Sequence, residues 1–217
     1  MDSEILETLP PLSRLALAYS PASARHDWLT VLALDARLAG VVRQVREPVL
    51  AQMKLAWWRD RLEQEAAARP RGEPLLARLA DWRDGGKPLV MLVNGWEALL
   101  SEPPLMAQAI ATFADGRAAL VGELAERLGG DRGAAVARAR RWALADLSLH
   151  SSDAEARAAA REMAISAAPA RGSCEPAMRP LAVLEQINLR ANRIGSTRAL
   201  GSPLALLTAI RVGLIGR

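Results

Sequence analysis

Apolar residues recur along this chain at helical spacing, in segments separated by proline and glycine. The clearest segment is residues 28–42, WLTVLALDARLAGVV, whose only polar residues are Thr30, Asp35 and Arg37. A helix that is apolar on nearly every side has to lie inside a protein rather than on its surface. The pattern therefore predicts a core helix over residues 21–45, with Pro21 in its first turn.

A second helix is predicted to begin at Pro48 and to pack against the core helix as a hairpin. Leu50, Met53 and Trp57 follow at spacings of three and four, which gives an apolar stripe. Further helical patterns cover residues 12–19, 75–82, 88–100, 105–130, 132–150, 154–163, 181–194 and 204–214. The residues before Pro10 show no strong pattern, and Asp84-Gly85-Gly86 closes the helix at 75–82.

No alternation of polarity with period two, the pattern of a half-buried strand, accompanies these helical segments. Residues 166–180 are rich in alanine, proline, glycine and serine, which predicts a loop. A chain of 217 residues is long enough for one domain with a sizeable core. We therefore expect an all-α fold, a single-domain helical bundle over residues 1–217.

Composition narrows the class of protein. A hydrophobic content of 51% with 24% charged residues is typical of a folded globular chain. The single Cys174 rules out a disulfide within the chain, and with only two histidines a zinc site of Cys and His ligands has too few members. Residues 1–4 are acidic where a secretory signal is basic, and no uncharged apolar run reaches ~18 residues. We expect a cytoplasmic protein.

The formal charge is +4, and nearly all the positive charge is arginine, because the only lysines are Lys54 and Lys87. Coding bias of the genome is one explanation, and an anionic partner is the other. No helix-turn-helix pattern or basic run with interleaved aromatics is present, which argues against nucleic acid. An anionic membrane surface is the more plausible partner. The stretch from Gln186 onward holds five arginines and no acid, which suits either such a surface or an ordinary final helix.

Residues 28–62 resemble the first conserved block of the squalene/phytoene synthase family. VLALDARLAGVVR lies on the family pattern a-L-Y-A-F-C-R-v-a-D-D-i-v-D, with Leu34 and Ala36 at the aromatic and arginine positions. The later W-R-x-x-L pattern is matched by Trp58-Arg59 and Leu62. The acidic positions of the family fall on Ala39, Gly40 and Arg43. The resemblance implies a shortened bundle of the terpenoid synthase type.

A second block, residues 105–130, resembles the family pattern Y-x-x-x-v-A-G-x-v-G. Phe113 stands at the tyrosine position, and Gly116 and Gly122 are the small positions, which we expect to let two helices approach closely. In residues 88–100 the family pattern places the end of a helix near Gly95, with Glu97 following.

The resemblance implies condensation of prenyl diphosphates, which requires Mg²⁺ held by two aspartate motifs on facing helices. The first motif is missing at positions 39, 40 and 43, and the second falls near Asp146, His150 and Asp153. Asp146 and His150 lie one turn apart and could share an ion. The alternative, which we favour, makes Asp153 an N-cap, Asp146 solvent-facing and His150 a polar residue at a helix end. We therefore expect no metal site and no cofactor, with Mg²⁺ needed only by an active prenyltransferase.

The candidate substrate-binding residues are Asp35, Arg43, Trp58 and Arg59. A carboxylate inside an apolar helix is costly unless it is paired, so Asp35 either points at an arginine, or faces a wet pocket, or belongs to a helix more exposed than expected. The tryptophan and arginine at 58 and 59 are either core packing beside a surface cation or a ligand-binding wall.

Two functions follow from the resemblance. The first is a non-catalytic family member, a lipid- or protein-binding scaffold or assembly factor on the inner face of the membrane, similar to the family's non-catalytic relatives that assemble respiratory complex I. Its partners would be an isoprenoid or other lipid, or a protein such as a respiratory complex subunit. The second is a prenyltransferase that condenses prenyl diphosphates. A long apolar tunnel in the bundle would favour lipid binding, and a filled core would favour a protein scaffold.

Overall fold

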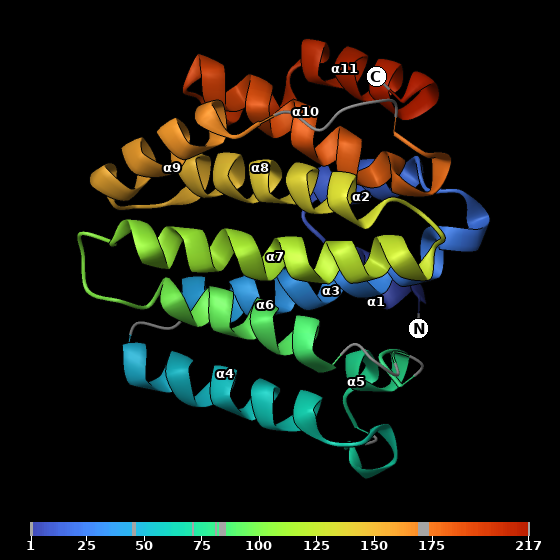
Figure 1. The fold of residues 1–217 in the computed structure, drawn as a ribbon, viewed down its shortest axis with the longest axis vertical. Helices are drawn as coiled ribbons and strands as arrows, with labels where there is room; N and C mark the ends of the chain where they lie inside the picture. Colours follow the sequence, from blue (N-terminus) through green and yellow to red (C-terminus); the bar gives the residue numbers. More distant parts are fainter. Residues whose placement is uncertain are drawn as a thin grey trace.

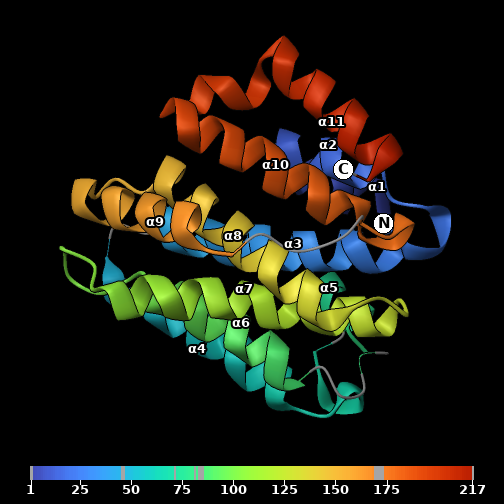
Figure 2. The ribbon, with the colours of Figure 1, turned by 45° about the horizontal axis from the view of Figure 1, so that its top comes forward.

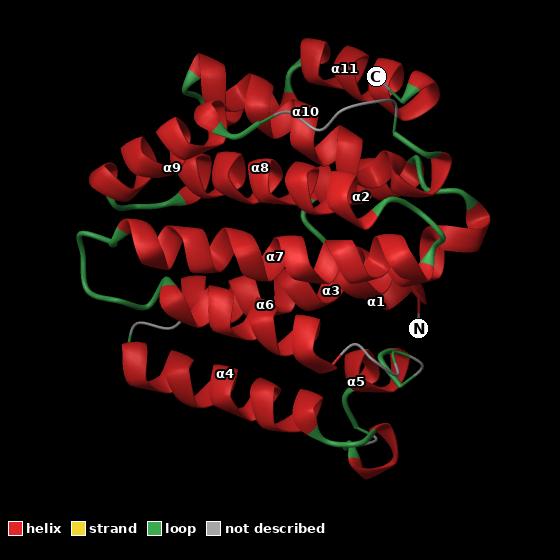
Figure 3. Cartoon of the chain, in the orientation of Figure 1, coloured by secondary structure: helices red, strands yellow, loops and turns green. Residues whose placement is uncertain are grey.

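The computed structural model describes residues 2–44, 47–70, 72–80, 82, 86–168 and 174–216. Within these residues every regular element is helical and none is a strand (Figure 3), which confirms the all-α fold. The predicted end of the core helix at Val45, the closing turn at Asp84 and Gly85, and part of the predicted loop at 166–180 lie outside the described residues. In the described part of the chain, no helix combines the length and the apolar character needed to cross a membrane.

The α-helices are α1 (Asp2–Thr8), α2 (Pro11–Ala18), α3 (Ala22–Gln44), α4 (Pro48–Glu63), α5 (Pro74–Arg78), α6 (Gly86–Ala98), α7 (Ala107–Arg127), α8 (Arg132–His150), α9 (Ala154–Ser166), α10 (Arg179–Ile194) and α11 (Pro203–Ile215). Three short 3₁₀ turns accompany them: η1 (Ala66–Ala68), η2 (Pro176–Met178) and η3 (Thr197–Gly201).

The long helices form a stack that follows the chain from one end of the molecule to the other. In Figure 1, α4 lies at the bottom, and α6, α7, α8, α10 and α11 follow upward, each packed on the one before. Helix α9 stands outside this series and packs beside α8. The core helix α3 passes behind α6, α7 and α8, as Figure 2 shows after a turn of the molecule. Helix α3 is therefore the element that the stack covers.

Helix α3 is buried along most of its length, as its sequence predicts. Trp28, Leu34 and Leu38 have no exposed surface, and Thr30 is equally buried. The Thr30 hydroxyl donates to the carbonyl of His26, and the Trp28 indole donates to the carbonyl of Ala177 at 2.7 Å. These two buried polar groups of the core helix are thus paired, as buried polar groups have to be.

Glycine sets the close packing of α6, α7 and α8. A Cβ on Gly116 would lie 2.4 Å from the carbonyl oxygen of Met91 on α6, and one on Gly122 would lie 2.7 Å from Val136 on α8. These contacts confirm the predicted packing role. Gly95 has the same role from the α6 side, where its Cβ would meet Phe113 at 3.1 Å. The expected helix end near Gly95 is wrong, because α6 runs through it to Ala98.

Three other expectations need correction. The residues before Pro10 form a short helix, α1, whose Ile5 packs into the core. Helix α4 contacts α3, but it packs chiefly on α6, which the hairpin prediction did not include. The helix expected at 75–82 is shorter, since α5 ends at Arg78. In each case the local pattern could not show which distant surface would receive the segment. Within the predicted loop at 166–180, η2 occupies 176–178 and α10 begins at 179.

Candidate ligand-binding site

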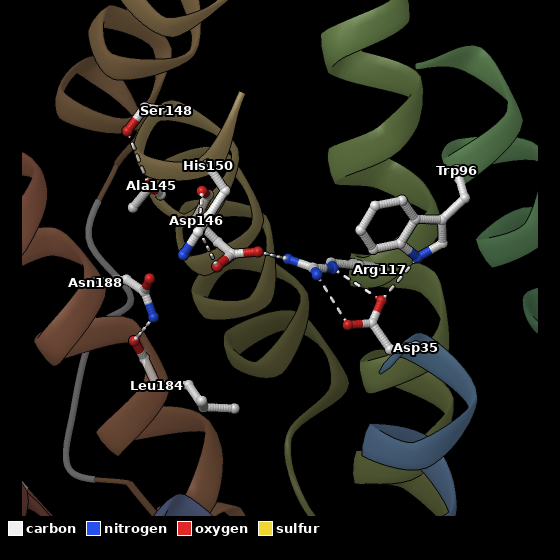
Figure 4. A network of polar contacts seen from close by, with 9 residues as sticks. All are labelled: Asp35, Trp96, Arg117, Ala145, Asp146, Ser148, His150, Leu184 and Asn188. Atoms are coloured by element: carbon white, nitrogen blue, oxygen red, sulfur yellow. Dashed lines mark hydrogen bonds and ion pairs between the residues drawn. The ribbon is translucent and has the colours of Figure 1, made fainter. Parts of the chain in front are cut away.

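A buried arginine on α7 joins three helices at the centre of the bundle. The Arg117 guanidinium donates to both carboxylate oxygens of Asp35 on α3, at 2.9 and 2.8 Å, and to Asp146 on α8 at 2.7 Å (Figure 4). The side chain of Arg117 is only 4% exposed. Asp35 therefore points at an arginine, which was the first of its three predicted environments, and a bidentate pair of this kind fixes geometry as well as charge.

Aromatic rings enclose the same guanidinium. Its central carbon lies 5.1 Å from the centre of the Trp96 ring, 4.7 Å from Phe113 and 4.6 Å from Trp142. The Trp96 indole also donates to Asp35 at 2.9 Å. Burial opposes the charge of Arg117, but the two carboxylates outweigh it and raise the pKa of this group above its ordinary value. The two carboxylates and the three rings therefore stabilise a charged guanidinium in the core.

The network continues to the end of α8. His150 Nδ1 lies 3.1 Å from the Asp146 carboxylate and 2.9 Å from the Asp146 carbonyl oxygen. Burial opposes ionisation of Asp146, yet Arg117 and His150 together hold the pKa of that carboxyl well below its usual range. The hydrogen bond to Asp146 in turn raises the pKa of His150 above its ordinary value, although partial burial opposes this. Asp146 is therefore not solvent-facing as expected; it is a paired carboxylate.

The tautomer of His150 follows from these contacts. Both partners of Nδ1 are acceptors, so Nδ1 carries a proton and Nε2 is left facing away from Asp146. Nε2 is an acceptor when the ring is neutral and a donor when it is protonated. The imidazole can thus offer a hydrogen bond to an anion only in its charged form.

A second cation, Arg43, stands near His150. Its guanidinium lies 6.0 Å from the centre of the Trp96 ring, and its charge acts against protonation of His150. Among the described residues no hydrogen bond or ion pair involves Arg43, and the residue is exposed. Arg43 is therefore available to a ligand, unlike Arg117.

Two cavities meet at this group of residues. The central cavity, of about 390 Å³, lies between α2, α3, α8 and α10, and the side cavity, of about 420 Å³, lies between α3, α6, α7 and α8. Both are lined by Arg43, Asp146 and His150. Apart from this polar edge, the central cavity has mostly apolar walls, including Leu12, Leu15, Leu32, Leu184 and Leu200. Cavities of this size and lining are typical of small-ligand sites.

One buried polar atom of the central cavity lacks a partner. Asn188 on α10 is fully buried, and its side-chain amide donates to the Leu184 carbonyl at 2.8 Å. Its carbonyl oxygen makes no hydrogen bond in the described part of the chain. Asn188 also lines the central cavity, and Figure 4 shows it facing α8, where Asp146 and His150 lie. An unpaired buried acceptor is costly, so this oxygen marks a place for a donor inside the cavity.

Two of the three residues that the resemblance places at acidic positions, Ala39 and Arg43, reach this cavity, but they do not suit magnesium. Ala39 and Arg43, one turn apart on α3, line the same cavity as Asp146 and His150 on α8. Ala39 offers no side-chain oxygen, Arg43 is a cation, and the oxygens of Asp146 are engaged by Arg117 and His150. Magnesium requires several oxygen ligands in octahedral order. No group of three or more His, Cys, Asp or Glu side chains in the described ranges could hold a metal ion.

The structure brings two of the four predicted site residues together and places the other two elsewhere. Asp35 and Arg43 line the central cavity. Trp58 is 4% exposed and lines a separate cavity of about 570 Å³ between α1, α3, α4 and α5. Arg59 is bound to Glu97 and to Asn94 on α6, and therefore ties α4 to α6. Trp58 therefore borders a cavity other than the central one, and Arg59 forms a contact between helices.

The expectation for Asp153 is confirmed, since its carboxylate accepts from the backbone of Glu155 as the N-cap of α9. Gly40 lines the cavity next to Trp58 and not the central one. Sequence reasoning missed Arg117, the residue that connects the site. The only available signal was an arginine inside an apolar helix, GRAALVGEL, which matches the buried carboxylate on α3.

Comparisons with protein-family models, with curated proteins and with solved structures found nothing that matches this chain.

Proposed function

We propose that this protein is a non-catalytic helical scaffold that binds a lipid-like ligand with an anionic head, such as an isoprenoid phosphate, in its central cavity. The observation that carries the proposal is the polar edge shared by the two cavities. Arg43 and His150 lie at this edge, and apolar side chains line most of the central cavity beyond it. A ligand with one charged end and an apolar body fits such a lining.

Charge at the edge favours an anion. Arg117 is neutralised by Asp35 and Asp146, which leaves one negative charge on these three groups together. Protonated His150 removes that charge, and Arg43 then adds an unpaired positive one. The binding edge is therefore cationic when His150 is charged and close to neutral when it is not. Phosphate or carboxylate is the matching chemistry.

The same residues argue against catalysis of the family type. Ionisation of a diphosphate needs metal ions at the leaving group, and a cation ~4 Å from a divalent ion is repelled by about 8 kcal/mol even at an effective dielectric near 20. Arg43 occupies such a position in the resemblance. The scaffold proposal therefore assigns binding, and no bond-breaking step, to this cavity.

A prenyltransferase remains the second candidate, because Ala39 and Arg43 face Asp146 and His150 across one cavity as the resemblance implies. Incubation of the purified protein with farnesyl diphosphate, with and without magnesium, separates the two. The scaffold proposal expects no pyrophosphate release in either case. Metal-dependent release together with a condensed hydrocarbon would establish the prenyltransferase.

Isothermal titration calorimetry with farnesyl monophosphate, in the absence of metal, tests the binding proposal. We expect binding that weakens roughly ten- to a hundredfold in Arg43→Gln, because one charge-assisted contact contributes about 1.5–3 kcal/mol. Binding should also weaken as the pH rises past the pKa of His150, since Nε2 then stops donating. Farnesol, which has the same apolar body without the charge, should bind less tightly.

Arg59→Gln is the matched control, because it removes the same charge from α4, where Arg59 is held by Glu97 and not by the cavity. Its affinity for farnesyl monophosphate should equal that of the unmodified protein. Equal losses in the two variants, or an affinity that is the same for farnesol and its phosphate, would contradict the proposed site.

A further inference from the structure

Helix α11 turns its large apolar side chains outward and its small ones inward. The buried positions are Ala205, Ala209, Val212 and Gly213. The exposed large residues are Leu204, Leu206, Leu207, Ile210, Leu214 and Ile215, each at least 41% exposed. At about 100° per residue, these two sets lie on opposite sides of the helix. We call the outward set the α11 face.

The inward side of α11 is fixed by close packing, so the outward side is not an accident of a loosely placed helix. Gly213 packs directly against the ring of Tyr19, where an added Cβ would come within 2.1 Å of a ring carbon. Ser202 caps the helix by accepting from the backbone of Ala205. The α11 face therefore stays outward in the folded protein, and its six aliphatic side chains meet solvent.

The charge around this face selects its partner. Residues 186–216 contain Arg190, Arg193, Arg198 and Arg211 and no acidic residue. Arg211 is exposed between Leu207 and Leu214 on the outward side of α11. Arg198 is exposed on η3, which leads into α11, and Arg193 is exposed near the end of α10. A second copy of this chain docking through α11 would bring like charges together, and residues 186–216 hold no carboxylate to neutralise them. An anionic surface would neutralise all of them.

The shape of the face also fits a plane. None of its exposed side chains lines any of the cavities described above, and α11 forms one end of the stack, opposite α4 (Figure 1). The helix has 13 residues, which is about 20 Å, shorter than the ~30 Å hydrocarbon core of a bilayer. It is therefore long enough to lie in the interface and too short to span it.

A contrast within the molecule supports this choice. Helix α4 also exposes apolar side chains, Val49, Leu50, Met53 and Trp57. Exposed acids stand on or beside the same helix, at Glu47, Asp60 and Glu63. Because Lys54, Arg59 and Arg61 balance these acids, α4 and its N-cap carry no net charge. An anionic surface would therefore attract the acid-free α11 more strongly than α4.

We infer that α11 is a membrane-docking helix, which lies in the interface of an anionic phospholipid leaflet with its six aliphatic side chains inserted and Arg211 and Arg198 at the level of the phosphates. This docking does not depend on the ligand in the central cavity. It would, however, bring that cavity close to the lipid, because Leu200 and Gly201 of η3, which lead directly into α11, form part of the cavity wall.

Vesicle flotation tests the inference, with phosphatidylcholine vesicles compared with vesicles in which part of the lipid is phosphatidylglycerol. We expect binding to the anionic vesicles that weakens as salt rises from about 0.1 M to about 1 M, since the Debye length shrinks from ~10 to ~3 Å. Leu207→Ser with Leu214→Ser should reduce binding by at least about tenfold, since each loses most of a buried leucine's transfer free energy. Arg198→Gln with Arg211→Gln should reduce it roughly fivefold per arginine and flatten the salt dependence.

Two matched variants serve as controls. Leu50→Ser with Met53→Ser removes similar exposed apolar surface from α4, and Lys54→Gln with Lys87→Gln removes two exposed cations far from α11 in the chain. Both should float like the unmodified protein. Because all the substituted side chains are exposed, circular dichroism should show the same helix content in every variant.

The fluorescence of an attached dye reports directly whether α11 inserts into the lipid. Leu207→Cys in a Cys174→Ser background carries one thiol for an environment-sensitive fluorophore, and Leu50→Cys in the same background is its partner on α4. Anionic vesicles should shift the emission of the dye at position 207 to the blue and leave the emission of the dye at position 50 unchanged. The inference would be overturned if the α11 and α4 variants floated equally, or if the protein bound neutral and anionic vesicles equally. It would also be overturned if the protein bound no vesicles and instead formed a dimer that Leu207→Ser with Leu214→Ser abolished. None of these outcomes would alter farnesyl monophosphate titrations, which test the cavity separately.

Discussion

Two clusters of arginine and carboxylate are buried in this bundle, and they differ in what lies beside them. At the central cavity, one arginine pairs with two carboxylates, since Arg117 binds Asp35 and Asp146. Between α8 and α10, two arginines pair with one carboxylate, since Arg138 and Arg141 bind Glu185 at 2.8 and 2.6 Å. Glu185 has no exposed side-chain surface and does not line the central cavity.

The difference shows how a cluster that only ties helices together can be told from one that also faces a ligand. The Glu185 cluster joins two helices that are already packed on each other. The Arg117 cluster joins α3, α7 and α8, borders a cavity, and continues to the titratable His150 and the unpaired Arg43. The second cluster therefore has chemistry that helix packing alone does not require.

The largest expected effect is on stability. Arg117→Met strips both carboxylates of their shared cation and should lower the free energy of unfolding by about 3–5 kcal/mol. Arg138→Met should cost less, about 2 kcal/mol, because Glu185 keeps Arg141. Urea denaturation followed by circular dichroism measures both. If the two losses are equal, the single cation of the central cluster is not what holds its carboxylates.

A smaller effect is expected at Asn188. Asn188→Leu removes an acceptor that has no partner and adds apolar volume to the central cavity, so stability should change by less than about 1 kcal/mol while the affinity for farnesyl monophosphate falls. Asn192→Leu, one turn further along α10, breaks the hydrogen bond to Ser148 and should cost about 1–3 kcal/mol without affecting binding. A thermal shift series with and without ligand gives both readings. Unchanged affinity in Asn188→Leu would remove this residue from the site.

The smallest effect is the pH dependence of stability. The pKa of His150 is raised by Asp146, so charged His150 contributes stability that is fully present below the unfolded pKa of about 6.5 and is lost as the pH rises through the folded pKa. The stability difference between the unmodified protein and His150→Gln should shrink over this window. It should remain under about 1 kcal/mol, because the imidazole is 35% exposed and solvent screens the pair.

Arg138→Met supplies the reference for this measurement, because the Glu185 cluster holds no histidine. Its loss of stability should be constant over the same pH range. A loss that varies with pH as much as that of His150→Gln would mean that the dependence arises elsewhere in the protein.

The sequence by itself determined the all-helical class and most of the helices, although it missed α1. Periodic apolar positions and proline or glycine breaks are local signals, and they identified α3 as the core helix and Gly116 and Gly122 as close-packing positions. The high cost of an unpaired buried carboxylate also gave an arginine partner as one of the three environments predicted for Asp35. These properties depend on neighbours in the chain or on burial alone.

Only the tertiary structure decided which distant residues meet. Asp35 and Arg117 are far apart in the chain, and the apolar neighbours of Arg117 indicate that it is buried but not which carboxylate it meets. The environment of Asp146 was predicted wrongly for the same reason, because a carboxylate on a helix is paired or solvated according to the helix that packs beside it. Helix α11 is the clearest case. Its sequence is apolar on both sides, so periodicity could not choose the inward face, and the contact of Gly213 with Tyr19 did.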